Sequence, residues 1–260
     1  MKAIILAAGR GTRLKKYTRD LPKGMLPFAG KTIIERQIGM YRKHGFTKII
    51  VVRGFAAEKI NYSGVTYYTN TRYADTNMVE SFMAAEEEFD EDVIVSYSDI
   101  VFEEKLLEGM MEIPDPAAAA VDDNWKEYWR MRYGRVDYDT ESLSIDEHDH
   151  IVELGREGVD PERIDARYIG LLKFSREGLQ TVVRIMEEAY RNHEGQAWQQ
   201  SGKTVRQAYM TDLLNALIQS GTDVRAVHFH NGWLEFDTNE DYELAIEAYQ
   251  DGRLKKMIVL

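Results

Sequence analysis

The residues best suited to chemistry lie in a glycine-rich, basic segment close to the N-terminus. Gly9 and Gly11 directly follow the apolar run Leu6–Ala8. Glycine lets the backbone approach a ligand closely and exposes a row of N–H groups, an arrangement that binds anions. Within residues 10–23 the basic side chains outnumber the acidic one, Asp20, by five (6 − 1), in a chain of net charge −11. The basic residues are Arg10, Arg13, Lys15, Lys16, Arg19 and Lys23. The pattern indicates a small polyanionic ligand; the alternative is a mobile basic loop beside a strand.

The glycine spacing does not match the two common phosphate-binding motifs. The segment lacks GxxxxGK[ST], and GxGxxG is incomplete because the next glycine after Gly11 is Gly24. What the segment does contain is LAAGRGTRL at Leu6–Leu14, then Pro22-Lys23 and Leu26-Pro27. This long signature resembles that of the sugar-nucleotidyltransferase superfamily. The resemblance covers essentially the whole chain, through Asp99 after an apolar run to Glu235-Phe236-Asp237.

The resemblance implies a nucleotidyl transfer that needs no general base. A phosphate oxygen of the acceptor attacks the α-phosphorus of a nucleoside triphosphate, and pyrophosphate leaves. Because the acceptor phosphate is already ionised at neutral pH, catalysis rests on positioning and charge neutralisation. By this resemblance Lys23 and Arg13 are catalytic, and Asp99 and Asp237 hold Mg²⁺ through their carboxylates. Without the resemblance, each Asp is a turn or cap residue and Lys23 is an ordinary surface lysine.

The resemblance also assigns two groups of nucleotide-binding residues. The first group lies at or just after the ends of two apolar strands and comprises Leu6, Ala7, Ala8, Gly9, Gly11, Thr12 and Ser98. The second lies in an Asn-x-x-Tyr-Ala-x-x-Asn run and comprises Asn70, Thr76 and Asn77. That run resembles the phosphocholine cytidylyltransferases of bacterial surface-polymer pathways. Sugar-specific enzymes carry a different segment here, and Glu-Lys-Pro where this chain has Glu153–Arg156. The expected nucleotide is therefore CTP, although a turn and a helix cap also explain the asparagines.

The acceptor is expected to lie against an aromatic, charged stretch in the middle of the chain. The candidate acceptor-binding residues are Asp122, Trp125, Trp129, Arg132 and Tyr168. Aromatic faces beside carboxylates suit an ammonium group, whereas Arg130 and Arg132 equally suit a carboxylate. The alternative is packing, because Trp125 and Trp129 are four residues apart, a spacing typical of the inner face of a helix.

These features predict a Mg²⁺-dependent cytidylyltransferase that transfers CMP from CTP to a small, amine-bearing phosphorylated acceptor. Phosphocholine, an aminoalkyl phosphonate and a phosphorylated amino acid such as phosphoglutamine all fit. The alternative function is a sugar-1-phosphate nucleotidyltransferase that uses another nucleoside triphosphate.

The elements that must position these residues alternate between short apolar runs and helical patterns. Strands are expected at Lys2–Ala8, Lys48–Val52, Val65–Thr69, Val93–Tyr97, Ala117–Val121, Tyr168–Phe174, Val224–His228 and Gly232–Phe236, with an antiparallel pair at Leu143–Asp146 and His150–Leu154. Helices are expected at Thr32–His44, Asn77–Phe89, Ser175–Arg191, Tyr209–Gln219 and Asn239–Tyr249, with Glu86–Glu88 as a solvated face.

This alternation predicts an α/β fold: a mostly parallel, Rossmann-like doubly wound sheet of the nucleotidyltransferase (GT-A-like) kind with a small antiparallel, aromatic insertion. We expect one domain over residues 1–260, with a nucleotide-binding half at 1–115 and an acceptor-binding half at 116–260 that completes the sheet and the metal site.

The composition excludes several other classes. With a pI near 5.1 the chain is a poor candidate for nucleic-acid binding, and the absence of cysteine excludes disulfides and thiol catalysis. No segment approaches the roughly 20 apolar residues of a membrane helix, and arginines follow the first apolar run where a signal peptide would be cleaved. We therefore expect a cytoplasmic protein with no nucleic-acid or membrane partner, acting as a monomer or homodimer.

Overall fold

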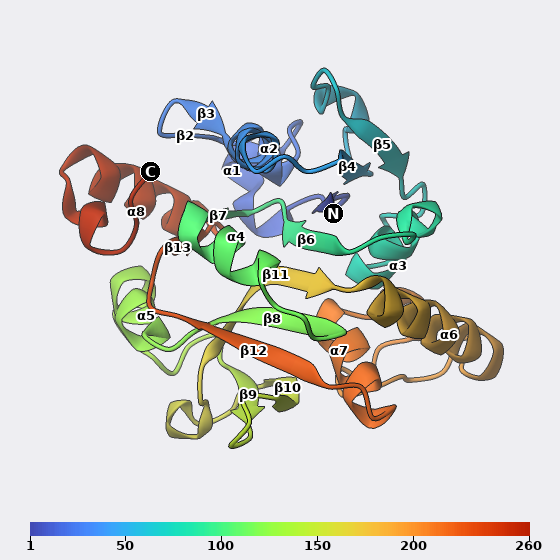
Figure 1. The fold of residues 1–260 in the computed structure, drawn as a ribbon. Helices are drawn as coiled ribbons and strands as arrows, with labels where there is room; N and C mark the ends of the chain where they lie inside the picture. Colours follow the sequence, from blue (N-terminus) through green and yellow to red (C-terminus); the bar gives the residue numbers. More distant parts are fainter.

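A seven-stranded sheet with one reversed strand forms the centre of the molecule (Figure 1). The computed structural model describes residues 1–260. From one edge to the other, the strand order is β12 (Val224–Phe229), β8 (Ala117–Asp122), β11 (Arg167–Phe174), β6 (Val93–Tyr97), β1 (Lys2–Ala7), β4 (Lys48–Arg53) and β5 (Thr66–Thr69). Only β11 runs antiparallel to its neighbours β6 and β8. Its N-terminal end therefore lies at the edge where the parallel strands have their carboxyl ends, which is where such sheets bind ligands.

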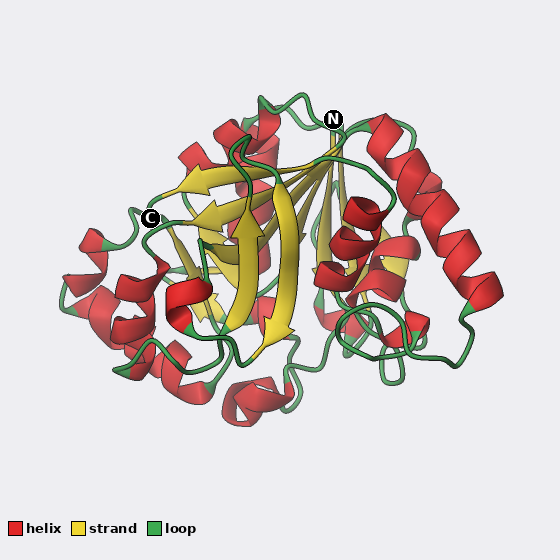
Figure 2. Ribbon diagram, turned by 90° about the horizontal axis from the view of Figure 1, so that it is seen from below, coloured by secondary structure: helices red, strands yellow, loops and turns green.

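Helices cover both faces of this sheet, which explains why its strands are continuously apolar (Figure 2). Along β1, Ala3, Ile5 and Ala7 pack into one hydrophobic cluster, whereas Ile4 and Leu6 pack into another, as the two-residue period of a strand requires. The first cluster includes residues of α2 (Ile33–Lys43), α4 (Glu104–Met111), α5 (Trp125–Tyr133) and α8 (Asn239–Gln250). The second includes residues of α3 (Met78–Met83), α6 (Arg176–Asn192) and α7 (Met210–Gln219).

Three short strand pairs flank the main sheet, and two of them shape the site. Strand β13 (Trp233–Glu235) pairs with β7 (Ile100–Phe102) so that Glu235 lies opposite Ile100, next to Asp99. The hairpin of β9 (Glu141–Ile145) and β10 (Ile151–Glu157) pairs Glu141 with Glu157. The third strand pair consists of β2 (Pro27–Phe28) and β3 (Lys31–Thr32), and it follows the one-turn helix α1 (Lys15–Thr18) in the chain.

The predicted fold class is confirmed: the fold is α/β with a mostly parallel sheet and a small antiparallel hairpin. The expected strands and helices are present within a few residues, while α4, α5 and β7 occupy segments for which no element was predicted. None of the helices has the length and apolar character that crossing a bilayer requires.

The segment predicted as one helix over Asn77–Phe89 is interrupted. Helix α3 ends at Met83, and Glu86–Glu88 forms a separate single turn. The expected solvated face is wrong for Glu88, which is 4% exposed. The Glu88 carboxylate accepts hydrogen bonds from Lys2 at 2.9 Å and Tyr68 at 2.8 Å, and it also pairs with Lys48. This carboxylate joins the first strand to two others at the edge opposite the glycine-rich loop.

We predict that Glu88→Gln lowers the free energy of unfolding by about 2 kcal/mol at neutral pH, because a buried charged partner is lost. Burial disfavours the charge of Glu88, but Lys48, Lys2 and Tyr68 hold its pKa below the ordinary value of a glutamate. The pKa of Glu88 is therefore lower in the folded protein than in the unfolded chain, and unfolding takes up a proton. The stabilisation by Glu88 is fully present above its pKa in the unfolded chain, and it is lost as the pH falls through its pKa in the folded protein. Urea denaturation between about pH 3 and pH 7 measures how the free energy of unfolding depends on pH. The exposed Glu86→Gln is the control, and an equal pH dependence in both variants contradicts the prediction.

Candidate active site

The glycine-rich loop folds back against Lys23. Gly11 has a left-handed backbone (φ +61°), and a Cβ atom there would lie 3.2 Å from the Lys23 Cβ. The Thr18 hydroxyl donates to the Gly11 carbonyl at 2.8 Å, which closes the loop. Leu6, Ala7 and Ala8 are buried, so these residues can offer a ligand only their backbone. Gly9 and Thr12 are accessible at the sheet edge.

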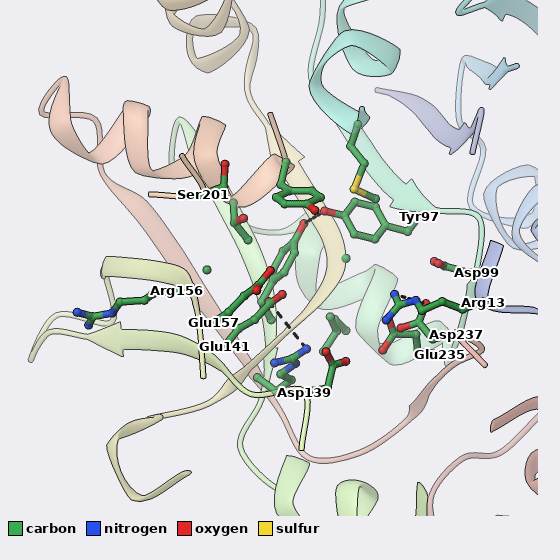
Figure 3. Close-up of a pocket in the computed structure, with 18 of the residues that line it drawn as sticks. Arg13, Tyr97, Asp99, Asp139, Glu141, Arg156, Glu157, Ser201, Glu235 and Asp237 are labelled. Carbon is green, nitrogen blue, oxygen red and sulfur yellow. Dashed lines mark hydrogen bonds and ion pairs between the residues drawn. The ribbon is translucent and has the colours of Figure 1, made fainter. Parts of the chain in front are cut away.

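Lys23 lies between two carboxylates at this edge. Its Nζ is 2.6 Å from Asp99 Oδ2 and 2.5 Å from Asp237 Oδ1, and Arg13 Nη2 is 3.1 Å from the same Asp237 oxygen. Figure 3 shows Arg13, Asp99, Glu235 and Asp237 converging on one side of a cavity. The structure thus brings together all four residues predicted to be catalytic or metal-binding.

Charge pairing sets the protonation of this cluster. Burial disfavours the charge of Lys23, but Asp99 and Asp237 raise its pKa above the usual value. Burial likewise disfavours the charge of Asp237, yet Lys23 and Arg13 hold its pKa well below the usual range. Burial, followed by the charge of Asp237, raises the pKa of Glu235 to about 8. Added positive charge therefore stabilises the ionised forms of these carboxyl groups.

The same cluster fits a hard divalent cation. Asp99, Glu235 and Asp237 each offer a carboxylate oxygen, and these atoms lie within 4.8 Å of one another. Asp99 Oδ1 is buried and has no hydrogen-bond partner. An all-oxygen donor set is what Mg²⁺ prefers, so Asp99, Asp237 and Glu235 are the residues that would hold it. Glu235 was not among the predicted ligands, although its position two residues before Asp237 was a signal that could have revealed it.

Arg132 lies behind these carboxylates and not in the acceptor space for which it was predicted. Its side chain is 1% exposed. Nη1 donates to Glu235 at 2.9 Å, while Nε and Nη2 donate to the two oxygens of Asp241 at 3.2 and 2.8 Å. Asp241 also accepts from the backbone N–H of Asp237. The sequence-based assignment of Arg132 is therefore corrected: it positions the carboxylate cluster from beneath.

A cavity of about 650 Å³ extends from the cluster across the sheet edge. Tyr168, predicted to bind the acceptor, lines this cavity, and its hydroxyl lies 2.9 Å from that of Tyr97. The left-handed Gly170 (φ +80°) permits this arrangement, because a Cβ there would lie 2.5 Å from the Tyr97 ring. Burial raises the pKa of both phenols, so both stay protonated and able to donate.

Three other predicted acceptor residues do not line the cavity. Asp122 is fully buried and accepts from the indole of Trp233 at 2.8 Å and from two backbone N–H groups. Trp125 and Trp129 are 2% and 0% exposed, with ring centroids 5.6 Å apart. The four-residue spacing directs both indoles to the inner face of α5. The aromatic box is therefore wrong, and the packing alternative holds.

We predict that Trp125→Phe lowers the free energy of unfolding by about 2 kcal/mol through lost core volume, while KM for the acceptor barely changes. Thermal denaturation and steady-state kinetics on the same preparation test both parts. An aromatic acceptor box would give the opposite pattern, with a large rise in KM and unchanged stability.

The Asn70–Asn77 segment, predicted to bind the nucleotide, is held in place by hydrogen bonds within the protein. Asn70 Nδ2 donates to Thr76 Oγ1 at 2.9 Å and to Ser81 at 3.1 Å, and Asn77 Oδ1 accepts from the Met78 N–H at 2.9 Å to cap α3. The Ser98 N–H donates to the Leu6 carbonyl at 3.2 Å. These contacts are those of the turn and the cap, so nucleotide contact by these residues stays a prediction.

Sequence reasoning missed several charged residues of the cavity wall, chiefly Glu141, Glu157 and Arg167. They come from the β9–β10 hairpin and the start of β11. No local motif marks them, because only the tertiary fold brings the hairpin beside the reversed strand.

Comparison with known proteins shows the family of this chain. Residues 3–154 match the family model of the MobA-like NTP transferase domain. The chain is 33% identical over 258 residues to a CTP:phosphoglutamine cytidylyltransferase of Campylobacter jejuni, covering 95% of this chain and 100% of that one. It is 28% identical to a 2-aminoethylphosphonate cytidylyltransferase of Lancefieldella rimae, covering 75% and 76% of the two chains.

A solved structure supports the fold. The CTP:phosphocholine cytidylyltransferase of Streptococcus pneumoniae superimposes with a TM-score of 0.71 at 22% identity, over 95% of this chain and 98% of that one. The predicted resemblance is thus confirmed, and the chain belongs to the MobA-like NTP transferase family of nucleotidyltransferases.

Proposed function

We propose that the protein is a Mg²⁺-dependent cytidylyltransferase that transfers CMP from CTP to a small phosphorylated, amine-bearing acceptor, with phosphoglutamine as the first candidate. The observation that carries the proposal is Lys23 held between Asp99 and Asp237 at the mouth of a glycine-rich basic loop. The relatives named above that use CTP act on phosphoglutamine, 2-aminoethylphosphonate or phosphocholine. Among them, the phosphoglutamine enzyme matches this chain over its full length.

The reaction balances as an in-line displacement. An oxygen of the acceptor phosphate forms a bond to the α-phosphorus of CTP, and the bond from that phosphorus to the bridging oxygen breaks, releasing pyrophosphate with the electron pair. Lys23 neutralises the charge that gathers on the α-phosphate, and Arg13 binds the β- and γ-phosphates. Mg²⁺, when held by the carboxylate cluster, supplies further charge neutralisation on phosphate oxygens.

The two halves of the chain divide these tasks. Residues 1–115 supply the glycine-rich loop and Asn70–Asn77, which we assign to the nucleotide, and Asp99, which we assign to the metal. Residues 116–260 supply Asp237, the hairpin and the start of β11, which we assign to the metal and the acceptor.

Because CTP is made and consumed in the cytoplasm, we place the reaction in the cytoplasm.

The test is pyrophosphate release with Mg²⁺ in a matrix of five nucleotides and four acceptor classes. The nucleotides are CTP, UTP, ATP, GTP and dTTP, and the acceptors are phosphoglutamine, phosphocholine, 2-aminoethylphosphonate and hexose-1-phosphates. We expect release with CTP and an amine-bearing acceptor. Release only with a hexose-1-phosphate overturns the proposal and supports the sugar-1-phosphate alternative.

A further inference from the structure

We infer that Arg167 binds a carboxylate of the acceptor and thereby selects an α-amino acid derivative over a simple amine. The inference rests on the proposed cytidylyltransferase function and extends it to the substrate class. Its starting point is one buried arginine on the cavity wall whose hydrogen-bonding capacity the protein leaves partly unused.

Arg167 is the first residue of the reversed strand β11 and is only 8% exposed. Its guanidinium carbon lies 4.6 Å from the centre of the Trp129 ring, which supports the group from one side. Nη1 is buried and has no hydrogen-bond partner. Nη2 reaches Glu141 Oε2 only at 3.8 Å, which is longer than a hydrogen bond.

The comparison with Arg132 shows what a purely structural buried arginine looks like in this protein. The three guanidinium nitrogens of Arg132 donate to Glu235 and Asp241 at 2.8 to 3.2 Å. Both arginines lie against Trp129, at 5.0 and 4.6 Å. Only Arg167 also lines the cavity, and its one carboxylate partner, Glu141, lies 3.8 Å away, beyond hydrogen-bond distance. A buried guanidinium with an unused N–H donor is a favourable site for an incoming anion, because a charged hydrogen bond to it satisfies the donor.

The same wall carries the acidic groups that an α-ammonium needs. Glu141 and Glu157 are cross-strand partners in the hairpin, and both line the cavity together with Asp139. Figure 3 shows Glu141 and Glu157 on one side of the cavity, Arg13, Asp99 and Asp237 on the other, and Asp139 between them. One end of the cavity therefore offers a guanidinium beside carboxylates, and the other end offers the phosphoryl-transfer cluster.

This arrangement matches a zwitterion joined to a phosphate. An α-amino acid presents an ammonium and a carboxylate on one carbon. Its ammonium can pair with the acidic groups while its carboxylate pairs with Arg167. Choline and aminoethyl groups have no carboxylate and leave Nη1 of Arg167 without a partner, and a hexose has no charge there. The acceptor class is therefore a side-chain-phosphorylated amino acid.

The test compares two acceptors that differ only in the carboxylate: glutamine phosphorylated on its side-chain amide, and the same derivative of γ-aminobutyramide. We expect the wild-type protein to favour the first by about 100-fold in kcat/KM, the range of a charged hydrogen bond. In Arg167→Met the preference should fall close to one, through a higher KM for the glutamine substrate alone. Arg163→Met, which removes an exposed charge of the single turn Pro161–Arg163 outside the cavity, should keep the wild-type preference.

Several results would overturn the inference. Equal losses on both acceptors in a folded Arg167→Met, checked by its thermal unfolding, would mean a structural role. Equal use of both acceptors by the wild-type protein would mean that no carboxylate is recognised. Absence of CTP-dependent turnover with any acceptor would instead overturn the proposed function beneath it.

A second measurement needs no variant, in case Arg167→Met does not fold. Free glutamine should inhibit the wild-type enzyme at least about 30-fold more strongly than free γ-aminobutyramide, competitively with the acceptor. Equal inhibition by the two compounds contradicts the inference.

Discussion

Replacing Lys23 with methionine is expected to lower kcat/KM for nucleotidyl transfer about 1,000-fold, the scale on which loss of one preorganised charge donor slows a reaction. Lys23 is the only side chain that contacts both Asp99 and Asp237 within 2.6 Å, and its ammonium is held at the edge where the phosphates must lie. Methionine keeps most of the side-chain volume and removes the charge. Steady-state pyrophosphate release with CTP measures the effect.

The Lys23→Met variant should also unfold at a lower temperature in metal-free buffer, because two buried carboxylates then lose their shared counter-ion. Added MgCl₂ should recover part of the difference, since a cation bound to the folded state stabilises it. Lys16→Met serves as control, because Lys16 pairs with the exposed Glu243 outside the cluster. If Lys23→Met keeps wild-type activity, Lys23 has no role in the mechanism.

Asp237→Asn is expected to cost about 1,000-fold in kcat/KM, and it should raise the Mg²⁺ concentration needed for half-maximal rate. Asp237 is the carboxylate on which most of the cluster depends: Lys23 lies at 2.5 Å, Arg13 at 3.1 Å and Arg132 at 3.8 Å. The amide removes one anionic metal ligand, leaves Arg13 without its carboxylate partner and leaves Lys23 with Asp99 alone.

Activity measured across a Mg²⁺ series separates the two consequences of Asp237→Asn, the loss of rate and the weaker metal response. The matched control is Asp251→Asn, an aspartate that follows α8 and pairs with Arg253. A wild-type metal response in Asp237→Asn would show that this carboxylate does not hold the ion.

Features carried by local sequence could be predicted. Continuous apolar runs specify strands buried on both faces, so β1, β4 and β6 were expected close to their observed bounds. The signature around Gly11 and Lys23 is likewise local, and it led to Asp99 and Asp237 through the resemblance. Their meeting point at the sheet edge follows from the parallel topology.

Features that depend on tertiary packing could not be predicted. Glu88 appears in a run of three glutamates that looks solvated, but Lys2 and Lys48 from neighbouring strands bury it. Trp125 and Trp129 looked suited to a ligand until α5 directed them inward. Arg167 attracts no notice in the sequence, since its role depends on Trp129 beneath it and on a hairpin that joins the cavity from elsewhere in the chain.

Lys23 makes metal and nucleotide binding interdependent. Its ammonium neutralises Asp99 and Asp237 and keeps three clustered acidic side chains tolerable. The phosphates of an arriving nucleotide would compete for that ammonium, and the carboxylates would then regain their attraction for a divalent cation. Each ligand must then raise the affinity for the other by the same factor. The bare ion alone should bind weakly, so the active arrangement assembles only when the nucleotide is present.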